Sequence, residues 1–229
     1  MGLINSFCRI VPGSVCLNGE DVFQTTSEPF VMKDFFSAVY EQAGIDYRRF
    51  YKMDALSKLG FLASEILLAG SDREHPKPDM GIIFFNKSSS LEADINYQKT
   101  IQDKYNFFPS PADFVYTLPN IVAGEIAIRN KIYGETTFYV LNRFSAEIDR
   151  IVEDAFCYGG IDYVLTGWVD VDVFNNTVDC LLMLCTSKTE RTSVNKCLPC
   201  LPPWLKGIRS GEVMEISANR LHYLHDYKK

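Results

Sequence analysis

The sequence predicts an α/β protein in which a mixed β-sheet lies between helical layers. Stretches with apolar residues at steps of three and four alternate with short β-rich runs along most of the chain. The run MGIIFFN at 80–86 is apolar almost throughout, as is typical of a strand buried on both faces of a sheet. The last two β-rich runs are separated only by VFNN at 173–176, which favours an antiparallel pair beside otherwise parallel strands.

The N-terminal third contains one short strand and two helices. Residues 4–10 can form the strand, and residues 11–21, with Pro and Gly, predict a loop. A short helix is predicted over 33–43, ending at Gly44. The strongest helical pattern follows within 51–70, where apolar residues recur at helical spacing up to a terminating glycine.

The middle of the chain predicts a helix interrupted by proline. After the polar connector 71–79, the strand at 80–86 and a loosely helical stretch at 91–104, a helix begins near Pro111 or Asp113. Pro119 lies inside its pattern, and an interior proline costs about 3 kcal/mol. We therefore expect a kink or a restart at Leu118.

The C-terminal half continues the alternation and then loses it. TTFYVLN at 136–142 predicts a strand, 143–156 a helix, and 158–172 a turn followed by a buried strand. The strand at 177–187 ends the periodic region. We expect one domain over residues 1–187 and a basic tail over 188–229 that packs on the domain or on a partner.

Composition excludes several functional classes. The 229 residues are 47% apolar, enough for the core of one large domain. The net charge of −6 arises from 23 basic and 29 acidic residues scattered along the chain, so no basic face is available for nucleic acid. No run approaches the roughly 20 apolar residues of a membrane span. With an odd count of seven cysteines, we expect a cytoplasmic protein.

The junction between the 136–142 strand and the next helix is where many α/β enzymes hold a nucleophile. The chain places Asn142, Arg143 and Phe144 there, and none of them is a nucleophile. The nearest hydroxyl, Ser145, falls inside the expected helix with no base in sight. Cys157 lies at the other end of that helix, where the helix dipole opposes a thiolate.

Four stretches resemble the β-ketoacyl synthases, the condensing enzymes of fatty-acid and polyketide assembly. PSPADFVYTLPNIVAGEIAIRNKIYGETTFYV at 109–140 resembles the family's helix leading into its nucleophile strand, and YGGIDYVLTGWVD at 158–170 its Gly-x-x-Asp-Val-x-Leu-x-Gly-Gly strand. The stretch 48–70 resembles the first core helix and MGIIFFNKSSS the second strand. The match runs in order over residues 4–187 and covers one of the family's two thiolase-like halves.

The resemblance implies a thiolase-like half with a five-stranded mixed sheet between helical layers, its fifth strand antiparallel. In the family, the strand before the nucleophile pairs with its counterpart across a dimer. The implied interface residues are Thr136, Thr137, Phe138, Tyr139, Val140 and Leu141. Phe138, Val140 and Phe144 are the implied wall of an acyl tunnel.

The resemblance also implies that the catalytic cysteine is missing. Counting forward from Gly134 places the cysteine position on Arg143, and counting back from Tyr158 places it on Asn142. The family's histidines and lysine come from the half that does not match. We therefore expect no catalytic residue, with Ser145 the remaining candidate, and no cofactor.

Histidines and cysteines elsewhere offer little chemistry. His222 and His225 lie in the tail outside any family context, which favours incidental, solvated histidines, and His75 lies in a Pro-rich loop. Cys197 and Cys200 form one C-x-x-C, half of a zinc site or a redox pair, but flanking prolines disfavour the helix that a redox motif needs. The two tail histidines could complete Cys2His2, although the spacing is unlike a zinc finger. We expect no metal.

Three functions remain open. The first is a non-catalytic, chain-length-factor-like subunit, most similar to the half-length subunits of aryl polyene and flexirubin pathways. Its partner would be a full-length ketosynthase in a heterodimer, or a second copy in a homodimer. Acyl carrier protein would be an indirect partner. The second is an active acyl-transfer or condensing enzyme with an unusual nucleophile, Ser145 or a thiol brought from elsewhere. The third is a stand-alone protein that binds an acyl carrier protein or a lipid, with the basic 188–229 segment as the surface for the carrier protein.

Overall fold

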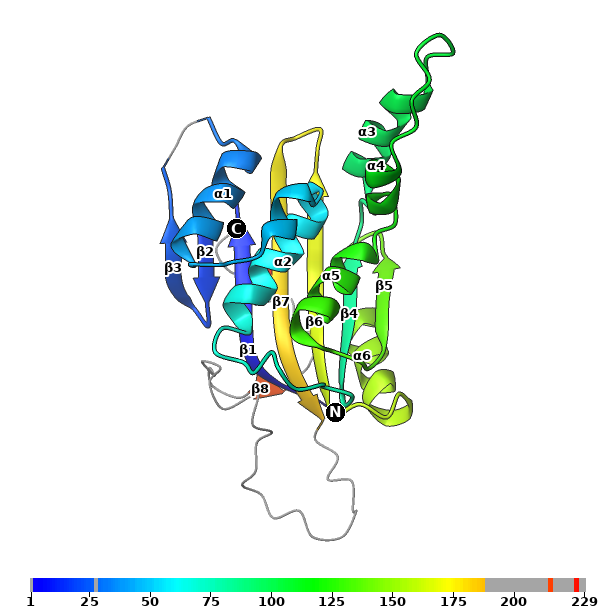
Figure 1. The fold of residues 1–229 in the computed structure, drawn as a ribbon. Coiled ribbons are helices and arrows are strands. Elements are labelled where there is room, and N and C mark those ends of the chain that lie inside the picture. Colours follow the sequence, from blue (N-terminus) through cyan, green and yellow to red (C-terminus); the bar gives the residue numbers. More distant parts are fainter. Residues whose placement is uncertain (1, 27–28, 188–213, 216–224, 227–229) are drawn as a thin grey trace, which may run out of the picture.

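The computed structural model describes residues 2–26, 29–187, 214–215 and 225–226. The described strands form one sheet in the order β3-β2-β1-β7-β6-β4-β5, and β8 pairs with β1 beside this path (Figure 1). The strands are β1 (Gly2–Val11), β2 (Ser14–Leu17), β3 (Glu20–Gln24), β4 (Met80–Asn86), β5 (Thr136–Val140), β6 (Tyr163–Asp172), β7 (Thr177–Ser187) and β8 (Met214–Glu215). The helices are α1 (Met32–Gln42), the 3-10 helix η1 (Arg48–Lys52), α2 (Ala55–Leu67), α3 (Leu91–Ile101), α4 (Pro111–Tyr116), α5 (Ile121–Asn130) and α6 (Glu147–Tyr158).

The directions of the strands agree with the expected mixed sheet. β4 pairs parallel with both β5 and β6. β7 runs antiparallel to both of its neighbours, β6 and β1, so the fifth of the five expected strands is the antiparallel one. The five expected strands are therefore present as β1, β4, β5, β6 and β7, with the expected directions.

The expected number of five strands is wrong, because the sheet continues beyond β1. The expected loop at 11–21 is instead largely a hairpin, in which residues 14–17 form β2 and residues 20–24 form β3. Gly13, at φ 77°, provides the first turn, and Asn18 and Gly19 form the second with φ of 53° and 91°. An Asn-Gly pair with both φ values positive is typical of a type I′ hairpin turn, which matches the twist of two antiparallel strands.

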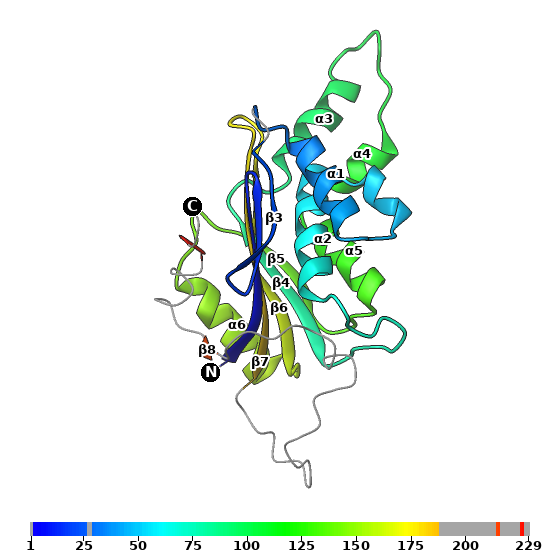
Figure 2. The same ribbon diagram turned by 90° about the vertical axis from the view of Figure 1, so that its left-hand side faces the viewer.

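Helices cover both faces of the sheet. Figure 2 shows α1 to α5 on one face and α6 on the other. Most of α2 is buried between the sheet and α5, so this helix is apolar nearly all round. On the opposite face, Ile148, Val152 and Phe156 of α6 pack over Ile83 and Phe85 of β4. β4 is therefore buried along its whole length, as its composition predicts.

The proline-containing helix is interrupted as expected, whereas the helix after β5 begins late. α4 starts at Pro111 with the Ser110 hydroxyl accepting from the Asp113 N–H at 3.2 Å, and α5 starts afresh at Ile121. The break at 117–120 confirms the restart near Leu118. α6 begins at residue 147, not at 143, because Phe144 is buried in the core and packs against Trp168, which places the residues before Ala146 outside the helix. In the described part of the chain, the helices are too short or too polar to span a bilayer.

We predict that Gly167→Ala destabilises the fold strongly. Gly167, in the middle of β6, has φ 146°, and an added Cβ would lie 1.9 Å from the Leu181 carbonyl oxygen of β7. The clash and the backbone strain together should lower the free energy of unfolding by about 3 kcal/mol or more. Urea denaturation measures this change.

Gly124→Ala is the matched control. No heavy atom outside α5 lies within 4 Å of the added Cβ. Alanine favours a helix over glycine, so this variant should gain roughly 0.5 to 1 kcal/mol. Equal effects of the two substitutions would contradict the close approach of β6 and β7 at Gly167.

Candidate functional site

A cavity lies where the carboxyl ends of the parallel strands meet. It has a volume of about 650 Å³ and is lined by Pro12 after β1, Lys87 after β4, Asn142 and Arg143 after β5, and Asp170 near the end of β6. Open α/β sheets bind ligands at this end of their strands. We call this cavity the carboxyl-end crevice.

The described residues of the crevice contain no nucleophile with a base. Asn142 and Arg143 are exposed, in the connection between β5 and α6. Ser145 lies two residues before α6 rather than inside it, and its hydroxyl has no hydrogen bond to a described acid or histidine. Arg143 stands four residues before the first residue of α6, so it is not at a helix tip where N–H groups would favour an anion.

His225 packs into the wall of the crevice, which corrects its interpretation as an incidental, solvated residue. Its side chain is 9% exposed. The imidazole stacks on Phe144, with ring centres 4.4 Å apart and planes at 15°, and meets Trp168 edge-on at 6.1 Å. His222, Cys197 and Cys200 lie outside the described residues, and His75 is exposed and contacts Asp72.

An ion pair between the buried Arg9 and the partly exposed Asp179 lies beside His225. The Arg9 side chain is 1% exposed, and its Nη1 lies 2.6 Å from Asp179 Oδ1 and donates to the Cys180 carbonyl at 2.7 Å. The other oxygen of Asp179 lies 3.1 Å from His225 Nε2, while Nδ1 faces Asp226 at 3.4 Å. Since both ring nitrogens face carboxylates, His225 is positioned as an anchor rather than as a base for the crevice.

β5 forms one edge of the sheet. It pairs with β4 on one side and with no described strand on the other. Thr136 and Val140 are exposed, Val140 by 52%, and the residues between them are half-buried. Among the described residues, no strand therefore covers the outer side of β5.

The side chains of β5 alternate between the two faces of the sheet. Phe138 packs against the core on the α2 face, while Tyr139 stacks on Phe85 on the α6 face with ring centres 5.5 Å apart. Leu141 follows on the α6 face, where Phe144 also packs. Phe138 and Phe144, two of the three residues expected to bound an acyl tunnel, thus lie in different core clusters.

The backbone groups of β5 alternate as well. The Ile82 N–H donates to the Glu135 carbonyl at 2.7 Å, and the Leu141 N–H donates to the Asn86 carbonyl at 2.7 Å. In a parallel ladder every second residue bonds the same neighbour, so Thr137 and Tyr139 face β4 like Leu141. The N–H and C=O groups of the even-numbered residues therefore point outward; these are Thr136, Phe138 and Val140.

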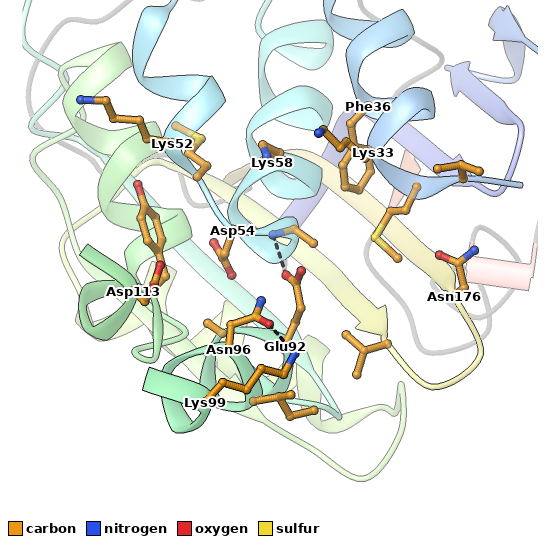
Figure 3. A pocket seen from close by; sticks show the side chains of 18 of the residues that line it. Lys33, Phe36, Lys52, Asp54, Lys58, Glu92, Asn96, Lys99, Asp113 and Asn176 are labelled. Carbon is orange, nitrogen blue, oxygen red and sulfur yellow. Dashed lines mark hydrogen bonds between the residues drawn. The ribbon is translucent and has the colours of Figure 1, made fainter. Parts of the chain in front are cut away.

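A second cavity, of about 720 Å³, lies on the helical face (Figure 3). Two carboxylates stand at the start of α2: Asp54 accepts from the Ser57 N–H at 3.1 Å, and Glu92 accepts from the Ala55 N–H at 2.9 Å. Burial raises the pKa of Asp54 to about 6, and the nearby Glu92 raises it as well. Among the described residues, no group of three or more His, Cys, Asp or Glu side chains could hold a metal ion.

The fold is that of ketosynthases and chain length factors. The chain superposes on "The ishigamide ketosynthase/chain length factor" with a TM-score of 0.58 and 15% identity, over 84% of this chain and 63% of that one. It superposes on a chain of the ketosynthase (ApeO) in complex with its chain length factor (ApeC) from Xenorhabdus doucetiae with a TM-score of 0.54 and 15% identity, over 83% of this chain and 81% of that one.

A third similar structure is a type II PKS acyl-carrier protein in complex with its ketosynthase, AntDE:AntF. The TM-score is 0.52 at 13% identity, over 82% of this chain and 62% of that one. The chain thus spans less than two thirds of the first and third structures. No protein-family model matches the sequence, and no curated protein does. The similarity to these three solved structures confirms the expected resemblance at the level of the fold.

Sequence reasoning missed Arg9 and Asp179 and misinterpreted His225. They come from β1, β7 and the C-terminal region, and the Arg9 bond to Cys180 spans 171 positions. No local spacing links such residues, so the only available signal was one arginine inside an apolar strand pattern.

We predict that Asp179→Ala lowers the free energy of unfolding by about 3 kcal/mol, because Arg9 then keeps its charge in the core without a carboxylate. The double variant Arg9→Met with Asp179→Leu removes both charges and should recover most of that loss. Chemical denaturation of the three proteins tests this. A single variant as stable as the parent would contradict a stabilising role for the pair.

We also predict that Asp54→Asn changes the pH dependence of stability. The pKa of Asp54 rises from 3.8 to about 6 on folding, so its contribution is fully present below pH 4 and is lost as the pH rises through 6. Asparagine also caps helices well but does not ionise. Relative to the parent, the variant should gain roughly 2 kcal/mol between pH 4 and pH 7. If the free energies of unfolding of the variant and the parent differ by the same amount at every pH, burial does not raise the pKa of Asp54.

Proposed function

We propose that the chain is a non-catalytic, ketosynthase-like subunit that pairs with a full-length ketosynthase through the outer edge of β5. The observation that carries this proposal is the open edge itself, with the outward backbone groups of Thr136, Phe138 and Val140 unused by any described strand. An open edge is a template for pairing with another chain.

The geometry of the edge suits an antiparallel partner strand. In such a pair, residues that exchange both backbone bonds lie directly opposite each other. A two-fold axis at Phe138 would set Thr136 opposite Val140 of a β5-like strand, so all three outward residues would find partners. The same register serves a second copy of this chain or a homologous strand of a ketosynthase.

Exposed apolar side chains accompany the open edge. Tyr133, just before β5, is 68% exposed, and Ile128 on the adjoining helix α5 is 64% exposed. Together with Val140, they give the edge apolar surface beyond the backbone bonds. Such surface favours burial by a protein partner.

The crevice supports the non-catalytic part of the proposal. Decarboxylative condensation needs a nucleophile to carry the acyl group and a base or oxyanion stabiliser beside it. The positions where the resemblance places the cysteine hold Asn142 or Arg143, and Ser145 has no described base. No observation in the described part of the chain favours the active-enzyme alternative.

The similar structures suggest the setting. Two of them are named for a ketosynthase with a chain length factor, and one contains a type II PKS carrier protein. We infer a cytoplasmic subunit of a fatty-acid or polyketide assembly, of the aryl polyene type, that meets acyl carrier protein through its ketosynthase. In this setting Phe138, Val140 and Phe144 would help to bound the acyl tunnel only once the partner's surface closes it.

Co-expression with a full-length ketosynthase, which the proposal expects to be encoded beside this chain, tests the proposal directly. A one-to-one complex by size-exclusion chromatography with light scattering is the expected result. Acylation of the purified chain by an acyl-loaded carrier protein, lost in Ser145→Ala, would instead establish an enzyme. A chain that stays monomeric in the presence of that ketosynthase would refute the subunit proposal.

We predict that Val140→Pro abolishes pairing while leaving the subunit folded. The N–H of Val140 points outward, so proline removes a bond to the partner but none to β4. Its exposed side chain contributes little to the core. Light scattering should show loss of the complex, with the thermal unfolding temperature of the isolated chain within about 3 °C of the parent.

Tyr139→Pro is the contrasting variant. The N–H of Tyr139 faces β4, so proline breaks the internal ladder and should cost about 3 kcal/mol of stability. Val140→Lys keeps the backbone N–H and tests the side chain alone. If Val140→Pro still forms the complex, the partner does not use the β5 edge.

A further inference from the structure

The cavity on the helical face is lined by four lysines. Lys33 comes from α1, Lys52 from η1, Lys58 from α2 and Lys99 from α3. Figure 3 shows the Lys33 and Lys58 side chains on one side of the cavity and Lys99 on the opposite wall. The chain as a whole carries a net charge of −6, so four lysines around one cavity contrast with its overall negative charge. We call this cavity the lysine pocket.

Lys33 and Lys58 form no ion pair with a described residue. The Lys58 ammonium lies 5.9 Å from the centre of the Phe50 ring, which is a weak cation–π contact. Burial lowers the pKa of Lys58; the negative charges of Glu92 and Asp54 raise it, and the neighbouring charge of Lys33 lowers it. Two ammonium groups that repel each other beside a cavity are stabilised when an anion enters between them.

Three acidic residues also line the pocket, and two of them are held by backbone hydrogen bonds. Asp54 and Glu92 accept hydrogen bonds from backbone N–H groups at the start of α2, where the helix dipole also offsets negative charge. The third carboxylate, Asp113, lies on α4. Figure 3 shows Asp54 and Glu92 near the middle of the pocket, apart from Lys33 and Phe36.

An apolar wall adjoins Lys33 and Lys58. Met32 and Phe36 of α1 form one part of it, and Val173 from the turn between β6 and β7 forms another. Phe174, in the same turn, is 79% exposed at the rim. A volume of about 720 Å³ is in the range of pockets that hold small organic ligands.

We propose that the lysine pocket binds an amphipathic anion, with a carboxylate or phosphate headgroup between Lys33 and Lys58 and an apolar chain along Met32, Phe36 and Val173. This site is distinct from the carboxyl-end crevice, since none of its lining residues lines that crevice. It does not depend on pairing through β5, so either proposal can fail without the other.

Isothermal titration calorimetry on the full chain tests this site with four probes. Decanoate and decyl phosphate combine an anionic headgroup with an apolar chain, decan-1-ol has the chain alone, and inorganic phosphate has the charge alone. At least one amphiphile should bind, below its micelle concentration, roughly tenfold more tightly than decan-1-ol and inorganic phosphate. The two amphiphiles together distinguish a carboxylate from a phosphate headgroup. Amide chemical shifts of Ala55 and Ala93, which line the pocket, locate the binding.

Charge-removing variants identify the residues. Lys33→Gln and Lys58→Gln should each weaken binding of the amphiphile roughly tenfold, the loss of one charge-assisted hydrogen bond. Lys33 is exposed, so its variant keeps the fold even if Lys58→Gln disturbs α2. Lys104→Gln, on the loop between α3 and α4, removes a lysine outside the pocket and should have no effect.

Three results would overturn the proposal. The first is the absence of binding by either amphiphile. The second is binding of decan-1-ol as tight as that of decanoate, which would show that no anion is recognised. The third is unchanged binding in Lys33→Gln and Lys58→Gln, which would place the ligand elsewhere on the chain.

Discussion

The parallel pairing of β4 with β5 on one side and β6 on the other is the constraint on which the rest of the structure depends. β4 is buried at every position, so helices must cover both faces of the sheet around it. Because the three strands run in the same direction, their carboxyl ends open into one crevice. Because β5 has no described neighbour beyond it, the same pairing leaves one edge of the sheet open.

Local physical signals account for most of the fold that the sequence predicts. The apolar run of β4, the helical spacing of α2 and the break at 117–120 each depend on residues within one short window. The hairpin of β2 and β3 had a local signal too, the Asn18-Gly19 pair, but the proline and glycines around it favoured a loop. The start of α6 depends on a distant contact, since Phe144 is drawn to Trp168, and no propensity encodes that.

The candidate site was less predictable for the same reason. The residues after β5 could be identified from the sequence alone, because residues 141–146 contain no cysteine. The ion pair of Arg9 with Asp179 and the stacking of His225 on Phe144 join segments far apart in the chain. Burial of a charged arginine inside a strand is stable only when a carboxylate arrives from elsewhere, and only the folded structure shows which one.

Two surfaces of the chain could accept a partner domain, the outer face of α6 and the edge of β5, and their chemistry differs. α6 is strongly amphipathic. Its apolar residues Ile148, Val152 and Phe156 face the sheet. On its outer face, Glu147, Arg150 and Asp154 are exposed. Charged side chains of this kind are well solvated and lose hydration when a protein covers them. The β5 edge instead offers unused backbone groups beside the exposed Val140 and Tyr133. Covering the edge therefore gains hydrogen bonds and apolar burial, whereas covering α6 costs desolvation, and this difference favours the β5 edge as the surface of the proposed pairing.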